Sequence, residues 1–261
     1  MKLTNKLCGA VLLATLGVAV AVPGITKADN TTFTGDMDIQ FTRNTGDDTD
    51  TTRPKLTDSD GNSDTDIESG SVTRPIRPAI FGIQDVTPLS FGMNAVVTDG
   101  NDRVFWAKNY TEKEAVMANN VLIKDVRSTL NHNYTLTAQI TKPMTTTVKD
   151  GEESQERTLS GATLLYRNIG RKTNVAEEIA LPTSAVKTSA EVTEASAVTI
   201  VDNTGSNKDQ GQGQTYIHFG KTNATGEESS EKSVKLTVGK DKTIFEGNYK
   251  GEVTWVLTAA K

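Results

Sequence analysis

The sequence predicts an all-β protein: an antiparallel β-sandwich with one short crossover helix, preceded by a disordered acidic linker. Over most of the chain, short apolar or alternating runs recur between clusters of Gly, Asn, Asp and Lys, as strands do between turns. Only "TEKEAVMANN" (111–120) has a helical pattern, opened by a capping box of Thr111 and Glu114. Residues 29–72 hold eleven acidic and three basic residues with few apolar ones, which is typical of disordered chain. One folded domain is therefore expected over residues 76–261.

The N-terminus is predicted to be a secretory signal peptide, residues 1–28. Lys2 and Lys6 form its positive end, and an apolar run over residues 12–22 follows. Because this run is too short for a comfortable bilayer crossing, no membrane span is expected. Cleavage after Ala28 would leave a secreted, extracellular protein.

Cleavage also removes the only cysteine, Cys8, and changes the formal net charge from −5 to −8, because three lysines leave with the peptide. A secreted chain without disulfides suits the exterior of a Gram-positive bacterium. The negative net charge argues against binding to nucleic acid and against adsorption to anionic lipid. A protein of this charge would need a local basic patch to hold an anionic wall polymer.

Residues 29–75 are predicted to contain one isolated strand, at 36–42, followed by the disordered linker. The apolar residues of that strand alternate with polar ones and would share one face. They are Met37, Ile39 and Phe41. Within the linker, residues 58–69 match three ligand spacings of a calcium loop but lack its glycine and its final glutamate. A solvated linker is therefore favoured there, and no metal site is predicted.

The strands expected in the domain follow one another along the chain, each marked by an apolar or alternating run. They are "AIFGIQDV" (79–86), "LSFGMNAVV" (89–97), "RVFWAKNY" (103–110), "NVLIKDV" (120–126), "YTLTAQIT" (134–141), "TLLYRNI" (163–169), "AVTIVDN" (197–203), "TYIHFG" (215–220), "VKLTVG" (234–239) and "GEVTWVLT" (251–258).

The last of these runs alternates with period two. Val253, Trp255 and Leu257 share one face, and the other face is mostly polar, so the run is expected to be a half-buried strand of an antiparallel sheet. Two interpretations of Trp255 stay open. It is either a core residue packed beside Leu257 or part of a binding face.

Residues suited to catalysis are scarce. The two histidines, His132 and His218, lack metal-ligand spacing, and no G-x-S-x-G motif occurs. The glycine-rich stretch at 211–214 precedes a strand, whereas a phosphate-binding loop needs a helix. No enzymatic activity, catalytic residue or cofactor is therefore predicted.

The order of the segments resembles the WxL surface domain of Gram-positive bacteria over residues 76–261. The terminal "YKGEVTWVLTAA" is similar to the distal motif of that family, with Trp255 and Leu257 as its W-x-L. "VLIKDVRSTLNHNYTLTAQI" is similar to the region of the proximal motif, although Tyr134 stands where the family has Trp, giving Y-T-L with Leu136. "LSFG", "SGATLLYRN" and "GQGQTYIHFG" are similar to further segments of the family.

The resemblance implies a protein attached without a covalent bond to the Gram-positive cell wall. Peptidoglycan or a wall-bound glycopolymer is the implied ligand, and other secreted surface proteins of the same gene cluster are implied partners. The sequence agrees with this expectation, because "LPTSA" at 181–185 only half resembles a sortase signal and no apolar tail follows it.

Aromatic and arginine side chains are often decisive in binding surfaces, and aromatic planes suit the apolar faces of sugars. Besides the two motifs, the possible wall-binding residues are Trp106, Tyr110, Tyr166, Arg167 and Arg171. Because Phe105 and Trp106 are adjacent in a strand, one of them must face outward or lie at an edge. The basic stretch 167–172 is either a solvated turn or the patch that holds an anionic polymer.

An alternative function is an adhesin or assembly subunit that binds another surface or host protein by strand pairing. The strand at 36–42, tethered by the linker, could then pair with its own domain or with a neighbour's sheet edge. A third class, a wall hydrolase, has no motif to support it.

Overall fold

The computed structural model describes residues 37, 39–40, 49–55, 65–97, 99–205 and 207–260. The chain divides into two units, residues 1–42 and 43–261, and nearly all described residues belong to the second. In the first unit Met37, Ile39 and Gln40 are exposed and have no regular secondary structure. The predicted signal peptide and most of the predicted strand at 36–42 lie outside the described residues.

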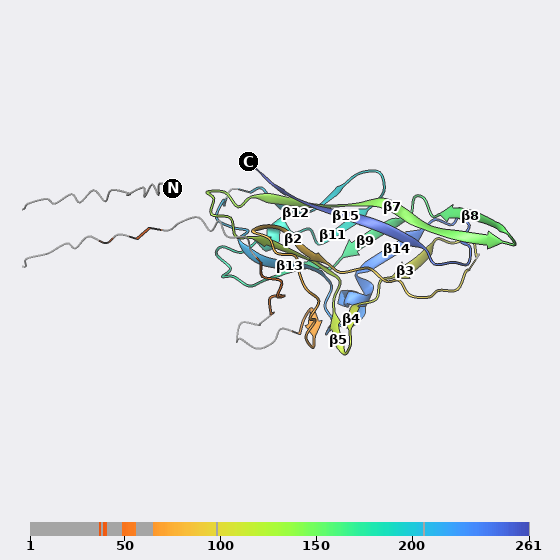
Figure 1. The fold of residues 1–261 in the computed structure, drawn as a ribbon, viewed down its shortest axis with the longest axis horizontal. Coiled ribbons are helices and arrows are strands. Elements are labelled where there is room, and N and C mark those ends of the chain that lie inside the picture. The colour runs from red at the N-terminus through yellow and green to blue at the C-terminus, as the bar shows by residue number, and fades with distance from the viewer. Residues whose placement is uncertain are drawn as a thin grey trace, which may run out of the picture. The chain divides into compact units, whose positions relative to one another are not determined.

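The second unit is built from antiparallel strands, which confirms the all-β class (Figure 1). The described residues form fifteen strands and three short 3₁₀ segments. The first large sheet has the order β10-β13-β6-β2: Ile169–Thr173, Gly213–Phe219, Asn120–Asp125 and Phe81–Val86. The second has the order β11-β9-β14-β3: Ser189–Val192, Thr163–Arg167, Val234–Val238 and Arg103–Trp106. The third has the order β12-β7-β15: Val198–Asn203, Tyr134–Asp150 and Lys250–Ala259, with β8 (Glu153–Thr158) paired to β7. A small sheet has the order β1-β5-β4: Glu68–Ser69, Ala115–Met117 and Tyr110–Glu112.

The three large sheets enclose one apolar core. Alternate residues of β9 and β14 are buried, as period-two alternation requires of strands with one face inward. Leu136 of β7, Leu236 of β14 and Ile217 of β13 belong to the same cluster. The core is thus shared by strands far apart in sequence, and removal of its apolar surface from water holds the sheets together.

The middle strands of the first sheet are covered on both faces. Within β6, Val121 and Ile123 face the main core, whereas Leu122 belongs to a second apolar cluster. Ile67 and Ile76 are buried in that second cluster, beside the small sheet. Double coverage explains why β6 reads as a continuous apolar run and not as an alternating one.

The second cluster corrects the expectation of a disordered linker. Ile67, Val72 and Ile76 lie in or beside the segment predicted to be disordered, yet all three are buried. Widely spaced apolar residues in an acidic segment give little periodic signal, so the sequence pattern missed their burial. Residues 56–64 of the predicted linker lie outside the described residues.

Residues 49–55 are also held against the domain. Arg53 is buried and forms an ion pair with Asp85 of β2, to which Arg74 also binds. The guanidinium carbon of Arg53 lies 6.0 Å from the centre of the Tyr216 ring, and the Tyr216 hydroxyl donates a hydrogen bond to the Pro54 carbonyl (3.1 Å). These residues form a strap that ends next to β2.

The predicted helix at 111–120 is wrong. Tyr110–Glu112 and Ala115–Met117 form the hairpin β4–β5, with Lys113 at a positive φ of 55° in its turn. Ala115 and Met117 are buried against the second cluster, and β1 pairs with β5. Pairing and burial on one face therefore override the local capping pattern.

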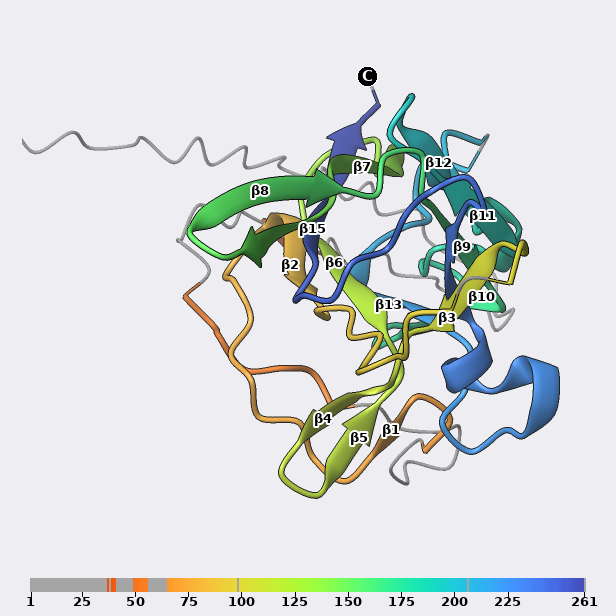
Figure 2. The ribbon, with the colours of Figure 1, turned by 90° about the vertical axis from the view of Figure 1, so that its right-hand side faces the viewer.

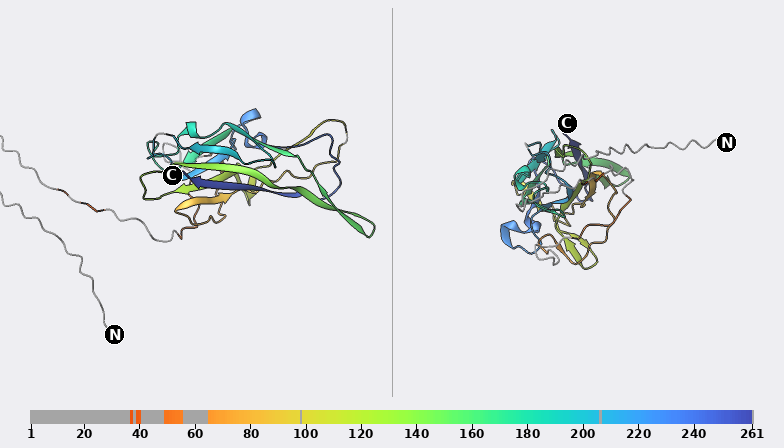
Figure 3. Two further views of the ribbon diagram at one scale, coloured as in Figure 1. Left: turned by 90° about the horizontal axis from the view of Figure 1, so that it is seen from above. Right: turned by 90° about the vertical axis from the view of Figure 1, so that its left-hand side faces the viewer.

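Two further segments differ from the sequence prediction. Residues 89–97 form a loop with a single bridge between Ser90 and Lys108, not a strand. Conversely, β8 is a strand whose residues are all exposed, so no apolar pattern in the sequence predicts it. Figure 2 shows β8 and the small sheet standing apart from one another. In Figure 3 β7 and β15 run side by side, and the hairpin formed by the end of β7 and by β8 projects beyond β15.

Candidate functional site

The two resemblance motifs lie on neighbouring strands of the third sheet. In the antiparallel register of β7 and β15, Leu136 is opposite Leu257, Ala138 is opposite Trp255, and Tyr134 is opposite Ala259. Directly opposite residues share a face, so both motifs direct their side chains to the same side of the sheet. The alternation within each strand does not reveal this pairing, because about 120 residues separate the motifs.

The proximal motif is entirely internal. Tyr134 and Leu136 are buried, and the Tyr134 ring lies 6.1 Å from the ring of Phe81. Burial, followed by the nearby carboxylate of Asp125, raises the pKa of the Tyr134 hydroxyl. The role of these two residues in the structure is therefore packing.

The distal motif is half-buried. The Trp255 ring makes an edge contact with Tyr166 (5.6 Å between centroids, 79°) and a stacked contact with Phe219 (6.0 Å, 28°). Tyr166 and Phe219 are themselves buried and 4.6 Å apart, and burial raises the pKa of the Tyr166 hydroxyl. Trp255 thus closes an aromatic cluster that joins all three large sheets.

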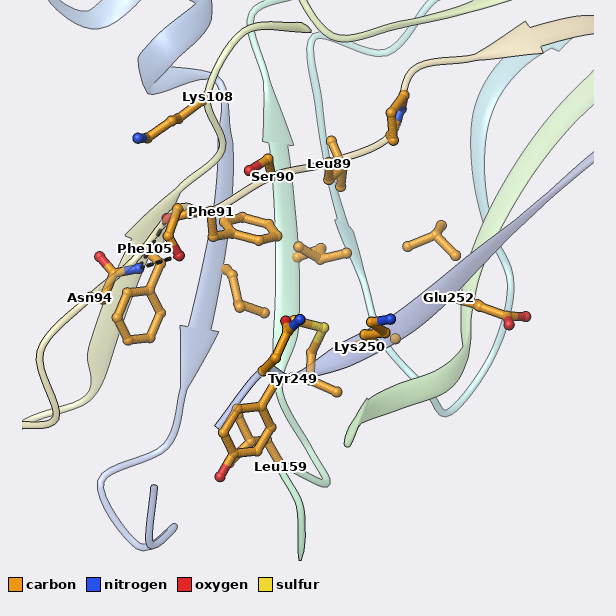
Figure 4. A pocket seen from close by; sticks show the side chains of 18 of the residues that line it. Leu89, Ser90, Phe91, Asn94, Phe105, Lys108, Leu159, Tyr249, Lys250 and Glu252 are labelled. Atoms are coloured by element: carbon orange, nitrogen blue, oxygen red, sulfur yellow. Dashed lines mark hydrogen bonds between the residues drawn. The ribbon is translucent and has the colours of Figure 1, made fainter. Parts of the chain in front are cut away.

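The uncovered side of this cluster opens into an apolar groove of about 1330 Å³. Loop residues 86–96 form one wall, and residues 244–253 form the other, with Lys250 and Glu252 at the rim (Figure 4). The side chains around the space come from both walls and from the sheets behind them. Figure 4 labels Leu89, Phe91, Phe105, Leu159 and Tyr249 among them. We call this space the Trp255 groove.

The edge of β15 beside the groove is unpaired. β15 ends the order of its sheet, so among the described residues it has β7 on one side only. The Ala260 N–H donates to the Asn133 carbonyl (3.0 Å), and hydrogen-bonded positions alternate along an antiparallel pair. Because the register is regular from Val253 onward, Val253 and Trp255 direct their N–H and C=O groups away from β7.

A second surface brings together two of the predicted wall-binding residues. Trp106 lies on the outer face of the second sheet, half-buried, while Phe105 packs towards the core. The guanidinium carbon of Arg167 is 4.9 Å from the centre of the Trp106 ring, and the ammonium of Lys232 is 5.2 Å from it. Lys235 is opposite Trp106 across β3 and β14. We call Trp106, Arg167, Lys232 and Lys235 the indole patch.

The side chain of Arg167 is fixed in the indole patch. Its Nε donates to the Lys232 carbonyl (2.6 Å), and its Nη2 lies 2.5 Å from a carboxylate oxygen of Glu227. Lys232 and Lys235 were missed by sequence analysis. They come from segments remote from Trp106, and only the strand order places them beside it.

The remaining predicted residues lie elsewhere. Tyr110 belongs to the small sheet and lies under the guanidinium of Arg74 (5.3 Å). Arg171, on β10, pairs with Glu177. Tyr166 is inside the aromatic cluster below the Trp255 groove. The stretch 167–172 is therefore not one basic patch, because its two arginines have separate acidic partners.

The histidines occupy structural positions. His132 Nδ1 is 3.2 Å from Asp125, whose carboxylate also binds Arg127 through two oxygens (2.9 and 2.8 Å). His218 is buried with Nδ1 3.0 Å from the Gly220 carbonyl oxygen, and burial lowers its pKa. Among the described residues, no three His, Cys, Asp or Glu side chains could share a metal ion. Within the same residues, no helix is long and apolar enough to cross a membrane.

Comparison with known proteins gives one match. A family model described as "WxL domain surface cell wall-binding" matches residues 28–260. The match begins well before the boundary expected at residue 76 and includes the docked segments at 49–55 and 65–75. Neither the search of curated proteins nor the search of solved structures found a match.

Proposed function

Because the chain belongs to the WxL domain surface cell wall-binding family, we propose that it is held on a Gram-positive wall without a covalent bond. Attachment at the cell surface follows from the family itself. Peptidoglycan, or a glycopolymer linked to it, is the proposed ligand. The family binds walls and is not an enzyme family, so the proposed role is adhesion and not hydrolysis.

The indole patch is the surface that we propose for wall contact. Trp106 is half-buried on the outer face of its sheet, and the part of its indole that stays exposed suits the apolar face of a sugar ring. Arg167 and Lys232 lie over the indole ring on a protein whose net charge is negative, and Lys232 and Lys235 supply positive charge there in addition to Arg167, which is paired with Glu227. The patch therefore meets the requirement that an acidic protein needs a local basic surface for an anionic wall polymer. The cation-flanked indole is the observation that carries this proposal.

Co-sedimentation with purified sacculi tests the proposal. Trp106→Ala is expected to weaken binding about tenfold, which corresponds to about 1.4 kcal/mol and is within the range for an interface aromatic. Lys232→Gln is expected to weaken binding as well, and more on walls that retain teichoic acid than on extracted peptidoglycan. Lys149→Gln, an exposed lysine of the projecting hairpin, is the matched control. Unchanged binding by folded Trp106→Ala would remove the indole patch from the proposal.

A second candidate function is an assembly subunit that joins other polypeptides by strand pairing. The unpaired edge of β15 beside the Trp255 groove favours it, because an open sheet edge presents a row of backbone donors and acceptors. Such a subunit could link secreted surface proteins to one another on the wall.

A further inference from the structure

The Trp255 groove combines three properties that one kind of ligand satisfies. Its volume of about 1330 Å³ exceeds the range of about 300–1,000 Å³ that is usual for small-molecule sites. Its lining is rich in apolar and aromatic side chains. One wall carries the unpaired backbone groups of Val253 and Trp255. An extended polypeptide strand uses all three, because it pairs with a sheet edge while alternate side chains enter apolar pockets.

The chain itself contains a segment of the matching pattern. Met37, Ile39 and Phe41 alternate with Asp38 and Gln40, so an extended conformation places the three apolar side chains on one face. These three side chains span about 13 Å, four residues at about 3.3 Å each. In the single chain, Met37 is 98% exposed and Ile39 is 74% exposed. The exposed Met37 and Ile39 side chains are thus available to pack in an apolar groove.

Charge favours the same pairing. The face opposite the three apolar residues carries Asp36 and Asp38. The lining of the groove carries three lysines and two glutamates and is therefore weakly positive, and Lys108 and Lys250 are exposed (Figure 4). The three lysines are Lys108, Lys142 and Lys250, and the two glutamates are Glu246 and Glu252. A strand that buried its apolar face in the groove would keep its acidic face towards solvent, where Lys108 and Lys250 are exposed.

We propose that the Trp255 groove accepts residues 37–41 of a second copy of this chain as an added strand beside β15. The length of chain between Phe41 and Arg53 limits how far the donor segment can extend from its own domain. Arg53 is fixed at Asp85, and the twelve residues from Phe41 to Arg53 span up to about 40 Å when extended. That length lets the donor segment leave its own domain and enter a neighbouring groove.

Each copy then offers one donor strand and one acceptor groove. Two copies that exchange strands form a closed dimer, whereas head-to-tail exchange forms a chain of subunits on the wall. This inference rests on the second candidate function and supplies its partner. It is independent of the indole patch, which is on the outer face of another sheet.

Sedimentation equilibrium of the mature chain tests the proposal. The wild-type protein is expected to associate in a concentration-dependent way, and Ile39→Asp to weaken that association at least tenfold. Gln40→Asp is the matched control, because it places the same charge on the opposite face of the segment and leaves association unchanged. Both positions are exposed, so neither substitution disturbs the folded domain. Equal association of the two variants, or a wild-type protein that stays monomeric at all concentrations, would overturn the proposal.

Fluorescence locates the strand in the groove. In a Trp106→Phe background Trp255 is the only tryptophan, and its emission is expected to shift on dilution through the dissociation range. The shift should be absent in Ile39→Asp and present in Gln40→Asp. Emission that depends on Ile39 but not on concentration would mean that each chain fills its own groove, which contradicts a second-copy donor. Sacculus binding by Ile39→Asp, with Trp106 intact, separates the outcomes, because lost association with normal wall binding leaves the proposed attachment standing.

Discussion

Replacing Trp255 by Ala tests whether the distal motif is a packing element or a ligand contact. A fully buried Trp covers about 150–250 Å², so a half-buried Trp255 covers about 100 Å², worth about 2.5 kcal/mol. The ring contacts with Tyr166 and Phe219 add about 0.5–1.5 kcal/mol each. The expected loss is about 3.5–5.5 kcal/mol, close to the cost of about 3–5 kcal/mol that is typical of Trp→Ala in a core, and a large part of the stability of an ordinary domain.

Thermal unfolding followed by circular dichroism measures this loss. For a chain of this length, about 2–4 °C per kcal/mol predicts a fall in Tm of about 10 °C. Val256→Ala, next to Trp255 on the exposed face, is the control and should change Tm little. Trp255→Ala should then lose sacculus binding only where it unfolds. A variant that melts like the wild type but no longer binds sacculi would refute the packing argument and assign Trp255 to the ligand.

Two further predictions concern His218 and the strap that contains Arg53. Burial lowers the pKa of His218, so the folded state favours the neutral imidazole; its contribution to stability is present above about pH 6.5 and is lost as the pH falls below that value. Urea unfolding at pH 7.5 and pH 5 should therefore show a loss of stability that is smaller in His218→Asn, and equal losses in both proteins would contradict the argument. Arg53→Ala removes one of the two arginines on Asp85 and is expected to cost about 2 kcal/mol, below the full cost of about 3–5 kcal/mol for breaking a buried pair because Arg74 remains. Limited proteolysis should then cut the strap faster than in Arg77→Ala, an exposed control, and equal cutting would show that Arg53 does not hold it.

The parts of the fold that could be predicted are those in which one face of a strand meets water. β9, β14 and β15 are of this kind, and their alternation is visible in the sequence. β8 could not be found, because none of its residues is buried and only pairing with β7 makes it a strand. The hairpin β4–β5 was mistaken for a helix, because a capping box is local whereas the burial of Met117 depends on β1 and the second cluster.

The candidate sites depend on strand order, which alternation does not reveal. Trp106 and Arg167 were both predicted, but their proximity requires β14 to lie between β3 and β9. The Trp255 groove likewise depends on the loop at 89–97, which the sequence predicts to be a strand. Individual side chains can thus be chosen from composition and pattern, whereas their grouping needs the folded topology.

The projecting β7–β8 hairpin is a suitable place to insert a label. At its tip Gly151 has a φ of 62°, and a Cβ built there would meet nothing within 4 Å. Since β8 buries no side chain, an epitope or dye inserted after Gly151 should leave the core undisturbed. Living cells could then be labelled through this tip while both surfaces proposed for recognition keep their native sequence.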